Sequence, residues 1–444
     1  MTPEVKQRIE QIRRGELPEG YKKTSLGIVP ANWIETTLGE IYTERNEPGN
    51  NDLPLLMVSI HSGVSDGEVD EEDLPKKVKR IDDKSQYKHA MPGDLVFNMM
   101  RAWQGAIGSV RTEGMVSPAY IVAAPNDLVD PVFMDYYMKT PRIINMLHRQ
   151  SYGVTDFRLR LYWDSFSPIP CVLPPIAEQR QIAEILVTQD KLIKVEQERV
   201  SALKKLKQAY MSKMFPKDGS IVPELRFGGY ADVWEQRKLG EVFDFLQNKT
   251  LSKADLSTEF GAAKNIHYGD VLINFGEYLD VSKSALPYIP SQQIADKYKS
   301  SWLKDGDIIM ADTAEDEAVG KCSEIAGLHG LPTISGLHTI PMRPVQKYAP
   351  GYLGYYLNSA AYHNQLLPLM QGIKVTSVSR SAIQDTVVAY PAEIAEQEAI
   401  GQYFIQLDSL ITLHQRKAEL QQKKKYALME LLLTGILTSI EEKS

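Results

Sequence analysis

Residues 174–182 read PPIAEQRQI, and a related opening, PAEIAEQEAI, occupies residues 391–400. A shift of 218 residues places Ile176 on Ile394 and gives identical residues at thirteen positions, as far along as Met211 on Met429. Two helices alike only in composition would share on the order of two identities in such a window. We therefore interpret the stretch as a duplicated element around which the rest of the chain is arranged.

Both copies are predicted to be long helices, because their apolar residues recur at three- and four-residue steps, the period of one helical face. Proline stands ahead of each copy, where first-turn amides have no partner anyway, and Gly219 and Gly435 follow the ends as helix stops. The expected length of about 34 to 38 residues is typical of a coiled-coil spacer. Such a helix is roughly 50 Å long.

The apolar stripe is interrupted in the middle of each copy. Glu196 and Arg199 in the first copy correspond to His414 and Lys417 in the second. If the helices pair antiparallel, these groups lie near one another, where polar residues cost stability and fix register. A solvated flank where the helices part explains the interruption equally well.

The segments ahead of the long helices also repeat. Residues 27–33 and 37–41 are similar in sequence to residues 227–234 and 238–242. Strand signals at 92–97 and short helix signals at 134–138 recur as 305–310 and 353–357. Residues 41–90 and 243–301 share little, which is what two different ligand sites on one scaffold would require.

The expected fold class is α+β, with two internally repeated α/β domains separated by two long antiparallel coiled-coil helices. The expected divisions are an N-terminal helical segment (1–27), the first α/β domain (28–175), the first long helix (176–216), the second α/β domain (217–392), the second long helix (393–434) and a C-terminal tail (435–444).

The charge is uneven, although the net charge of the 444 residues is −7. A basic patch can bind phosphate even on an acidic protein. The two basic clusters at helix ends have another explanation, since cations complement a helix C-terminus. The three clusters are Lys76, Lys77, Lys79, Arg80 and Lys84; Lys204, Lys205, Lys207, Lys213 and Lys217; and Lys423, Lys424 and Lys425.

Two distant cysteines, Cys171 and Cys322, indicate a reducing compartment and no structural zinc. The polar N-terminus predicts no signal peptide, and the longest apolar run is too short to span a bilayer. We expect a cytoplasmic protein with no membrane partner.

No catalytic constellation is evident. Residues 318–322 resemble the end of a phosphate-binding loop, but Glu315 stands where the first glycine belongs and Cys322 replaces Ser or Thr. The acidic run 312–317 is read as a solvated loop rather than a metal site. We expect a non-catalytic chain that holds no metal and no cofactor.

The organisation of the chain resembles that of the DNA-specificity subunits of type I restriction–modification systems. The resemblance is carried by residues 173–179 with their helix, by 390–397, by Trp33 and Trp234 with the Leu-Gly-Glu that follows each, and by segments 98–105 and 155–161. It covers essentially the whole chain. The second copy departs from the pattern at 391–393, where one residue is inserted and the double proline is lost.

This resemblance implies two target recognition domains, each reading one half of a split sequence in double-stranded DNA. It implies that the paired helices set the spacing and dock two modification subunits, which hold S-adenosylmethionine and methylate adenine. Separate motor–nuclease subunits would consume ATP with Mg²⁺ and cut.

Candidate site residues follow from this interpretation, because base readout needs Arg, Lys, Asn or Gln on strands or loops that reach a groove. For each of them an ordinary surface charge or framework ion pair is an equally good explanation. The DNA-binding candidates are Lys77, Lys79, Arg80, Arg101, Gln104, Arg158 and Arg160 in the first domain and Lys264, Asn265, His267, Lys374 and Arg380 in the second. The partner-binding candidates are Glu178, Gln179, Ile182 and Leu186 on the first helix and Glu396, Gln397, Ile400 and Phe404 on the second.

Two other classes of protein remain possible. A coiled-coil scaffold that joins proteins explains the helices and the negative charge, but not two domains that differ mainly in their inserts. A self-contained DNA methyltransferase or nuclease needs a cofactor loop or a carboxylate–lysine cluster.

Overall fold

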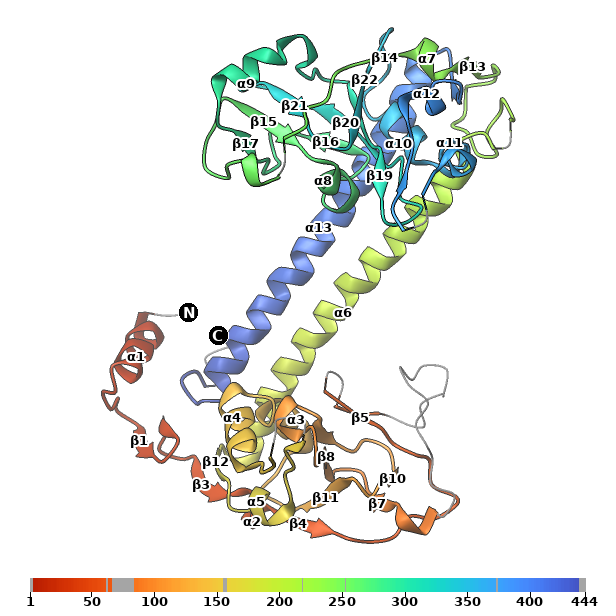
Figure 1. The fold of residues 1–444 in the computed structure, drawn as a ribbon. Coiled ribbons are helices and arrows are strands. Elements are labelled where there is room, and N and C mark those ends of the chain that lie inside the picture. Colours follow the sequence, from red (N-terminus) through yellow and green to blue (C-terminus); the bar gives the residue numbers. More distant parts are fainter. Residues whose placement is uncertain are drawn as a thin grey trace. The chain divides into compact units, whose positions relative to one another are not determined.

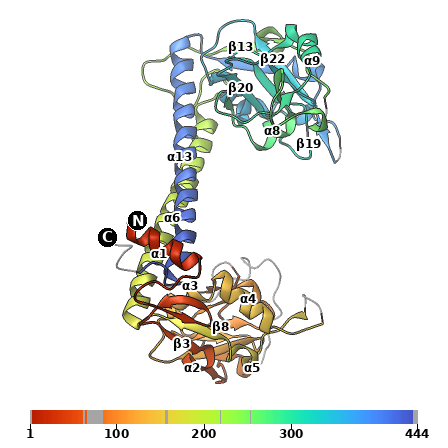
Figure 2. The ribbon, with the colours of Figure 1, turned by 90° about the vertical axis from the view of Figure 1, so that its left-hand side faces the viewer.

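The computed structural model describes residues 3–60, 63–65, 84–154, 158–217, 219–251, 253–372 and 374–438. It is a mixed helix and strand fold that divides into two compact units. Unit 1 comprises residues 1–195 and 417–444, and unit 2 comprises residues 196–416. Each unit therefore contains an α/β domain together with part of both long helices (Figures 1 and 2).

The long helices are α6 (Ile176–Lys213) and α13 (Ile394–Leu432). Both predictions of helix are confirmed, and each helix begins shortly after the prolines that precede it. In Figure 1 both run as continuous helices without a break.

Unit 1 is built on a four-stranded antiparallel sheet of order β4-β11-β8-β9. Its strands are β4 (Tyr42–Arg45), β11 (Tyr120–Pro125), β8 (Leu95–Asn98) and β9 (Ile107–Ser109). The two-stranded pairs are β1 (Tyr21–Thr24) with β2 (Gly27–Pro30), β3 (Ile34–Thr37) with β12 (Pro170–Leu173), β5 (Val58–Ser59) with β6 (Gly63–Val64) and β7 (Lys88–Ala90) with β10 (Gly114–Val116). The shorter helices are α1 (Pro3–Arg13), α2 (Leu38–Ile41), α3 (Pro131–Tyr137), α4 (Pro141–Gln150) and α5 (Trp163–Phe166).

Unit 2 repeats this sheet with one more strand, in the order β14-β22-β18-β20-β16. Its strands are β14 (Phe243–Phe245), β22 (Thr339–Pro344), β18 (Ile308–Ala311), β20 (Cys322–Ala326) and β16 (Tyr278–Asp280). A second sheet joins β17 (Tyr288–Ile289), β15 (Ala263–Ile266) and β21 (Thr333–Ser335), and the pairs are β13 (Glu235–Lys238) with β24 (Val387–Tyr390) and β19 (Thr313–Ala314) with β23 (Thr376–Ser377). The shorter helices are α7 (Leu239–Val242), α8 (Tyr268–Ile273), α9 (Gln292–Lys297), α10 (Tyr352–Asn358), α11 (Ala360–His363) and α12 (Arg380–Ile383).

A buried aspartate marks the same place in both sheets. Asp94 and Asp307 each follow a glycine with positive φ, and each directly precedes a buried strand. Arg45 binds Asp94 at 2.8 Å, and Arg343 binds Asp307 at 2.7 Å. A buried carboxylate is costly unless it is paired, so this ion pair belongs to the framework of each domain.

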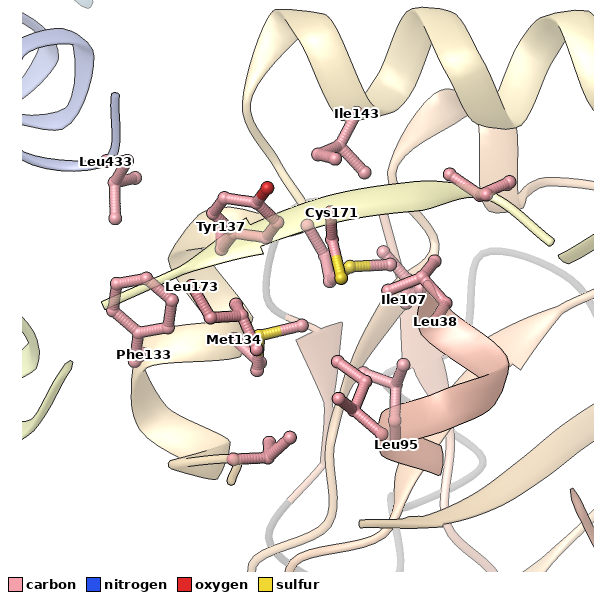
Figure 3. Close-up of a cluster of buried hydrophobic side chains, with 14 of the residues drawn as sticks. Leu38, Leu95, Ile107, Phe133, Met134, Tyr137, Ile143, Cys171, Leu173 and Leu433 are labelled. Atoms are coloured by element: carbon pink, nitrogen blue, oxygen red, sulfur yellow. The ribbon is translucent and has the colours of Figure 1, made fainter. Parts of the chain in front are cut away.

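Each hydrophobic core is completed by the end of a long helix. In unit 1, Leu428, Leu432 and Leu433 pack with the sheet and with α3 and α4, and Figure 3 draws Leu433 in that cluster. In unit 2, Met214 and Phe215, which directly follow α6, occupy the equivalent place. This explains why the compact units cut across both helices.

Two of the polar residues that interrupt the apolar stripes of the long helices contact each other in unit 2. Glu196 Oε2 lies 2.5 Å from His414 Nδ1, and both side chains are mostly buried. Lys207 contacts Asp408, and Tyr210 contacts Tyr403, so residue numbers fall along α13 as they rise along α6. Within unit 2, the two helical segments are therefore antiparallel, and the Glu196–His414 pair is part of their seam rather than a solvated flank.

Candidate nucleic-acid interface

The start of each long helix is fixed to its domain by a buried glutamine. Gln179 Oε1 accepts from the Asp130 amide, and its Nε2 donates to the carbonyls of Leu128 and Pro174 at 2.8 and 2.9 Å. Gln397 repeats this arrangement, accepting from the Ala349 amide. A buried side-chain amide without hydrogen bonds would destabilise the fold. Both glutamines therefore have a structural role, because their hydrogen bonds attach the long helix to the domain.

The neighbouring glutamates are also engaged within their own units. Glu178 is half-buried and accepts a hydrogen bond from Trp33 Nε1, and burial raises the pKa of its carboxyl. Glu396 is buried and forms a two-point ion pair with Arg226, at 2.6 and 2.7 Å.

These positions correct the expected partner surface. Ile182, Leu186, Ile400 and Phe404 are core residues, and Gln179, Glu396 and Gln397 are equally buried. Side chains that face the chain's own core cannot contact a partner; Glu178 alone among the eight is part-exposed. Helical periodicity identifies an apolar face, but it does not say whether that face meets this chain or another one.

Four of the apolar helix positions that reach the surface repeat between the helices. Leu192 and Val195 on α6 are exposed, and so are Leu410 and Leu413 on α13. Each pair maps onto the other under the 218-residue shift. The sequence contained this signal in the identical Leu192 and Leu410, but only the structure separates exposed from buried leucines.

In unit 1, two candidate regions lie together. Arg101 and Gln104 are exposed on a 3₁₀ turn, Ala102–Gln104, between β8 and β9. The Leu161 amide donates to the Met99 carbonyl at 2.8 Å, which places the loop that carries Arg158 and Arg160 beside this turn. Both of these arginines are exposed.

Apolar and aromatic groups border these basic residues. Tyr152 is exposed and stacks on Tyr162, while its backbone pairs with that of Arg160. Met100 is also exposed. Basic residues mixed with exposed rings suit a nucleic-acid surface, and the sequence interpretation missed the rings because tyrosine is common in cores. Lys77, Lys79 and Arg80 lie outside the described residues.

Three candidates in unit 2 have structural roles. Lys264 is half-buried and its Nζ donates to the Val281 carbonyl at 3.3 Å. Asn265 is fully buried on β15, where its side chain faces the Ile334 carbonyl. His267 caps α8 by accepting from the Gly269 amide. Asn265 is therefore out of reach of a DNA groove, which corrects its assignment as a base-reading residue.

The other two candidates lie at one edge of unit 2. Arg380 Nη2 donates to Asn248 Oδ1 at 3.4 Å on the wall of a polar hollow of about 330 Å³. Lys374 is exposed in the loop that leads to β23. The Val378 amide donates to the Asp312 carbonyl, the counterpart of the Leu161–Met99 bond in unit 1. Lys374 and Arg380 both lie near Val378, so they correspond to the loop that carries Arg158 and Arg160, and the segment after Asp312 carries none of the candidates.

A strained residue stands near this edge. His338 has φ +53°, and it is the one non-glycine with positive φ in the described part of the chain. Its ring lies 5.2 Å from that of Tyr268, and its Nδ1 is 3.4 Å from Asp312. Such strain tends to gather at functional sites, and the sequence gives no sign of it.

A larger hollow in unit 1 has a different character. It measures about 720 Å³ and is lined mainly by apolar groups, among them Ile28, Trp33, Ile143 and Leu433. It offers few groups that could read a base edge.

No cluster of His, Cys, Asp and Glu suited to a metal ion occurs among the described residues. Within the same ranges, no helix is long and apolar enough to cross a membrane.

The chain is similar to specificity subunits. It is 25% identical over 316 residues to the specificity subunit of the type I restriction enzyme MjaVIII from Methanocaldococcus jannaschii, covering 70% of this chain and 71% of that protein. It is 23% identical over 411 residues to the EcoKI specificity subunit from Escherichia coli K12, covering 87% of this chain and 82% of the relative.

The fold is shared with a solved chain from work on complex assembly and conformational transition of a type I restriction–modification system. The TM-score is 0.54 at 18% identity, over 92% of this chain and 99% of that one. No protein-family model matches the sequence. The two relatives and the shared fold make the chain similar, over most of its length, to the specificity subunits of type I restriction enzymes.

Proposed function

We propose that this chain is the non-catalytic subunit that determines the DNA sequence specificity of a cytoplasmic type I restriction–modification complex. Each unit would read one half of a bipartite sequence in double-stranded DNA. The observation that carries the proposal is the duplicated framework with different inserts. The buried Asp–Arg pair and the buried glutamine at the start of the long helix recur in both units, whereas the second sheet differs: it has three strands, β17-β15-β21, in unit 2 and two, β7 and β10, in unit 1.

The DNA-facing edge of each unit is assigned to the two paired elements described above. In unit 1 both elements carry candidates, with Arg101 and Gln104 on the turn and Arg158 and Arg160 on the loop. In unit 2 the candidates Lys374 and Arg380 both lie around Val378, on the second element. Arginine can bind guanine with two hydrogen bonds, and glutamine can bind adenine in the same way. Cations that contact phosphate would position the chain without specifying sequence.

The long helices would form an antiparallel coiled coil that sets the spacing of the half-sites. α6 and α13 contain 38 and 39 residues. At about 1.5 Å per residue, each is nearly 60 Å long, which is on the order of 15 to 17 base-pair steps of 3.4 Å. Two readers held at one spacing bind together only to sites with that spacing, because the second contact becomes intramolecular.

The chemistry would belong to partner subunits. Two modification subunits would bring S-adenosylmethionine and methylate adenine, and motor–nuclease subunits would bring ATP and Mg²⁺. The exposed pairs Leu192/Val195 and Leu410/Leu413 suit docking of two identical subunits, because they occupy equivalent positions in the repeat.

A selection experiment tests the proposal. The chain would be purified with its modification subunits and mixed with random-sequence DNA, and the bound fraction would be sequenced. We expect two short motifs at a constant separation. Enrichment of no bipartite motif would reject the proposal and favour a protein-interaction scaffold.

A further inference from the structure

A cluster of three side chains in unit 1 joins the α/β domain to both long helices. The Tyr136 hydroxyl on α3 donates to Asp190 Oδ2 on α6 at 2.7 Å. Lys425 on α13 lies 2.6 Å from the other oxygen of Asp190, and its Nζ is 5.3 Å from the centre of the Tyr136 ring. Domain, first helix and second helix therefore meet through one carboxylate.

Unit 2 contains the same cluster. The Tyr355 hydroxyl on α10 donates to Asp408 Oδ2 at 2.7 Å, and Lys207 Nζ lies 2.7 Å from Asp408 Oδ1 and 5.2 Å from the Tyr355 ring centre. Asp190 and Asp408 are equivalent under the 218-residue shift, and so are Lys207 and Lys425. Each unit thus takes its aspartate from one repeat and its lysine from the other.

The chemistry of the cluster favours a defined geometry. A hydroxyl and an ammonium that share one carboxylate form charge-assisted hydrogen bonds, which are shorter and stronger than neutral ones. Desolvation and the aspartate raise the pKa of both Tyr136 and Tyr355 well above the ordinary value, so each hydroxyl remains a donor. Lys207 is also bound by Glu277 at 2.7 Å, which adds a further tie in unit 2.

We propose that Tyr136 and Tyr355 are positioning residues that fix the angle of each recognition domain on the helical segments of its own unit. This inference rests on the proposed function, because its consequence concerns DNA spacing. A domain held at one angle presents its DNA-binding edge at one place along the duplex, so the complex rejects half-sites that are one base pair too close or too far. Loss of the hydroxyls lets the domain tilt, and the spacing requirement relaxes.

The test uses the complex with its modification subunits and a DNA pool that contains both half-sites with spacers of varied length. The test variant combines Tyr136→Phe with Tyr355→Phe. The matched control combines Tyr137→Phe with Tyr356→Phe, because these adjacent hydroxyls accept from the Val172 and Ala389 amides inside the domains. Enrichment of each spacer length is measured by sequencing, and unfolding midpoints are recorded for all three proteins.

We expect the test variant to lose about 3- to 10-fold of its preference for the best spacer over its neighbours, the effect of one hydrogen bond per unit. Both half-sites should remain unchanged, and the control should keep the parent's spacer profile even if its unfolding midpoint falls. A test-variant profile that matches the parent's would overturn the positioning role while leaving bipartite recognition intact. Equal broadening in the control would also overturn it, because the effect would then follow general loosening. Failure of the parent itself to select a bipartite motif would reject the proposed function and the positioning role together.

Discussion

Glu196 and His414 contact each other at 2.5 Å, and each is the other's counterpart in the repeat. In an antiparallel pair of repeated helices, such a self-equivalent contact is expected only at the middle of the pair. The two side chains differ, so a position that duplication would make identical now carries an acid and a base.

A double-mutant cycle at this pair tests whether it stabilises the seam. His414→Leu alone removes the imidazole from the mostly buried Glu196, which keeps its ion pair with Arg199, and should cost about 1 kcal/mol. Glu196→Leu together with His414→Leu should restore most of that loss, because replacing both partners by apolar groups is often nearly neutral. Urea unfolding of the full chain measures both. Additive losses in the double variant would show that the two groups do not interact.

Removing the exposed arginines of unit 1 should affect one half-site only. Arg101→Ala or Arg160→Ala is expected to weaken binding by about 1–3 kcal/mol if the arginine reads a base, with relaxed sequence preference at one position. If the arginine contacts phosphate, the loss of affinity should be the same for all sequences. The slope of the logarithm of the binding constant against the logarithm of the salt concentration should then fall by about one. Binding is measured by titration of the complex with target DNA at several salt concentrations. Lys23→Ala, which removes an exposed lysine of β1, serves as the control. Altered preference in the unit 2 half-site would contradict the assignment of one half-site to each unit.

Sequence reasoning succeeded where the repeat constrained it. The long helices, the strands after Asp94 and Asp307 and the short tyrosine-bearing helices were predicted because both copies carry the same periodicity. It was less successful for the site. Gln179 and Gln397 looked like surface amides, because nothing local reveals that a domain closes over them.

The Tyr–Asp–Lys clusters escaped notice for a related reason. Asp190 and Lys207 appear in the sequence as identities within one helix, yet the structure pairs each with a residue of the other repeat. Sequence periodicity indicates which residues share one face of a helix or strand. The contacts of the Tyr–Asp–Lys clusters instead depend on which elements pack against each other.

The end of α6 should be needed for the core of unit 2. The Phe215 ring packs against those of Phe404, Trp234, Tyr352 and Tyr356. Phe215→Ala should cost about 3–5 kcal/mol and make unit 2 sensitive to protease, whereas the matched Leu433→Ala should act on unit 1. Mass mapping of the first cleavage sites distinguishes the two variants. Equal cleavage of both units in both variants would argue against separate cores.

Unit 2 should lose stability as pH rises toward neutrality. Burial raises the pKa of Glu324 from 4.5 to about 7, although the Gly351 and Gly354 amides donate to its two oxygens at 2.7 and 2.9 Å. Because the folded protein holds this proton more tightly than the unfolded chain, the stabilisation is full below pH 4.5 and is lost as pH rises through about 7. The loss should reach on the order of 3 kcal/mol. Unfolding midpoints of the parent and of Glu324→Gln, compared from pH 5 to 8, measure it. The variant should lack this component, so an unchanged difference across the range would refute the assignment.

Lengthening both helices should change the spacing of the target and leave its half-sites unchanged. Four residues inserted after Glu196 and four after His414 add about one helical turn, or 6 Å, to each helix, which is roughly two base-pair steps. The apolar face returns nearly to its former direction after four residues, so the seam can re-form. Sequencing of selected DNA should therefore show the same two motifs with a spacer longer by one or two base pairs. An insertion of four residues in α6 alone is the control, because it shifts the register of the helix pair and should weaken binding at every spacing. Selection of the parent's spacer by the doubly lengthened chain would mean that the helices do not set the distance.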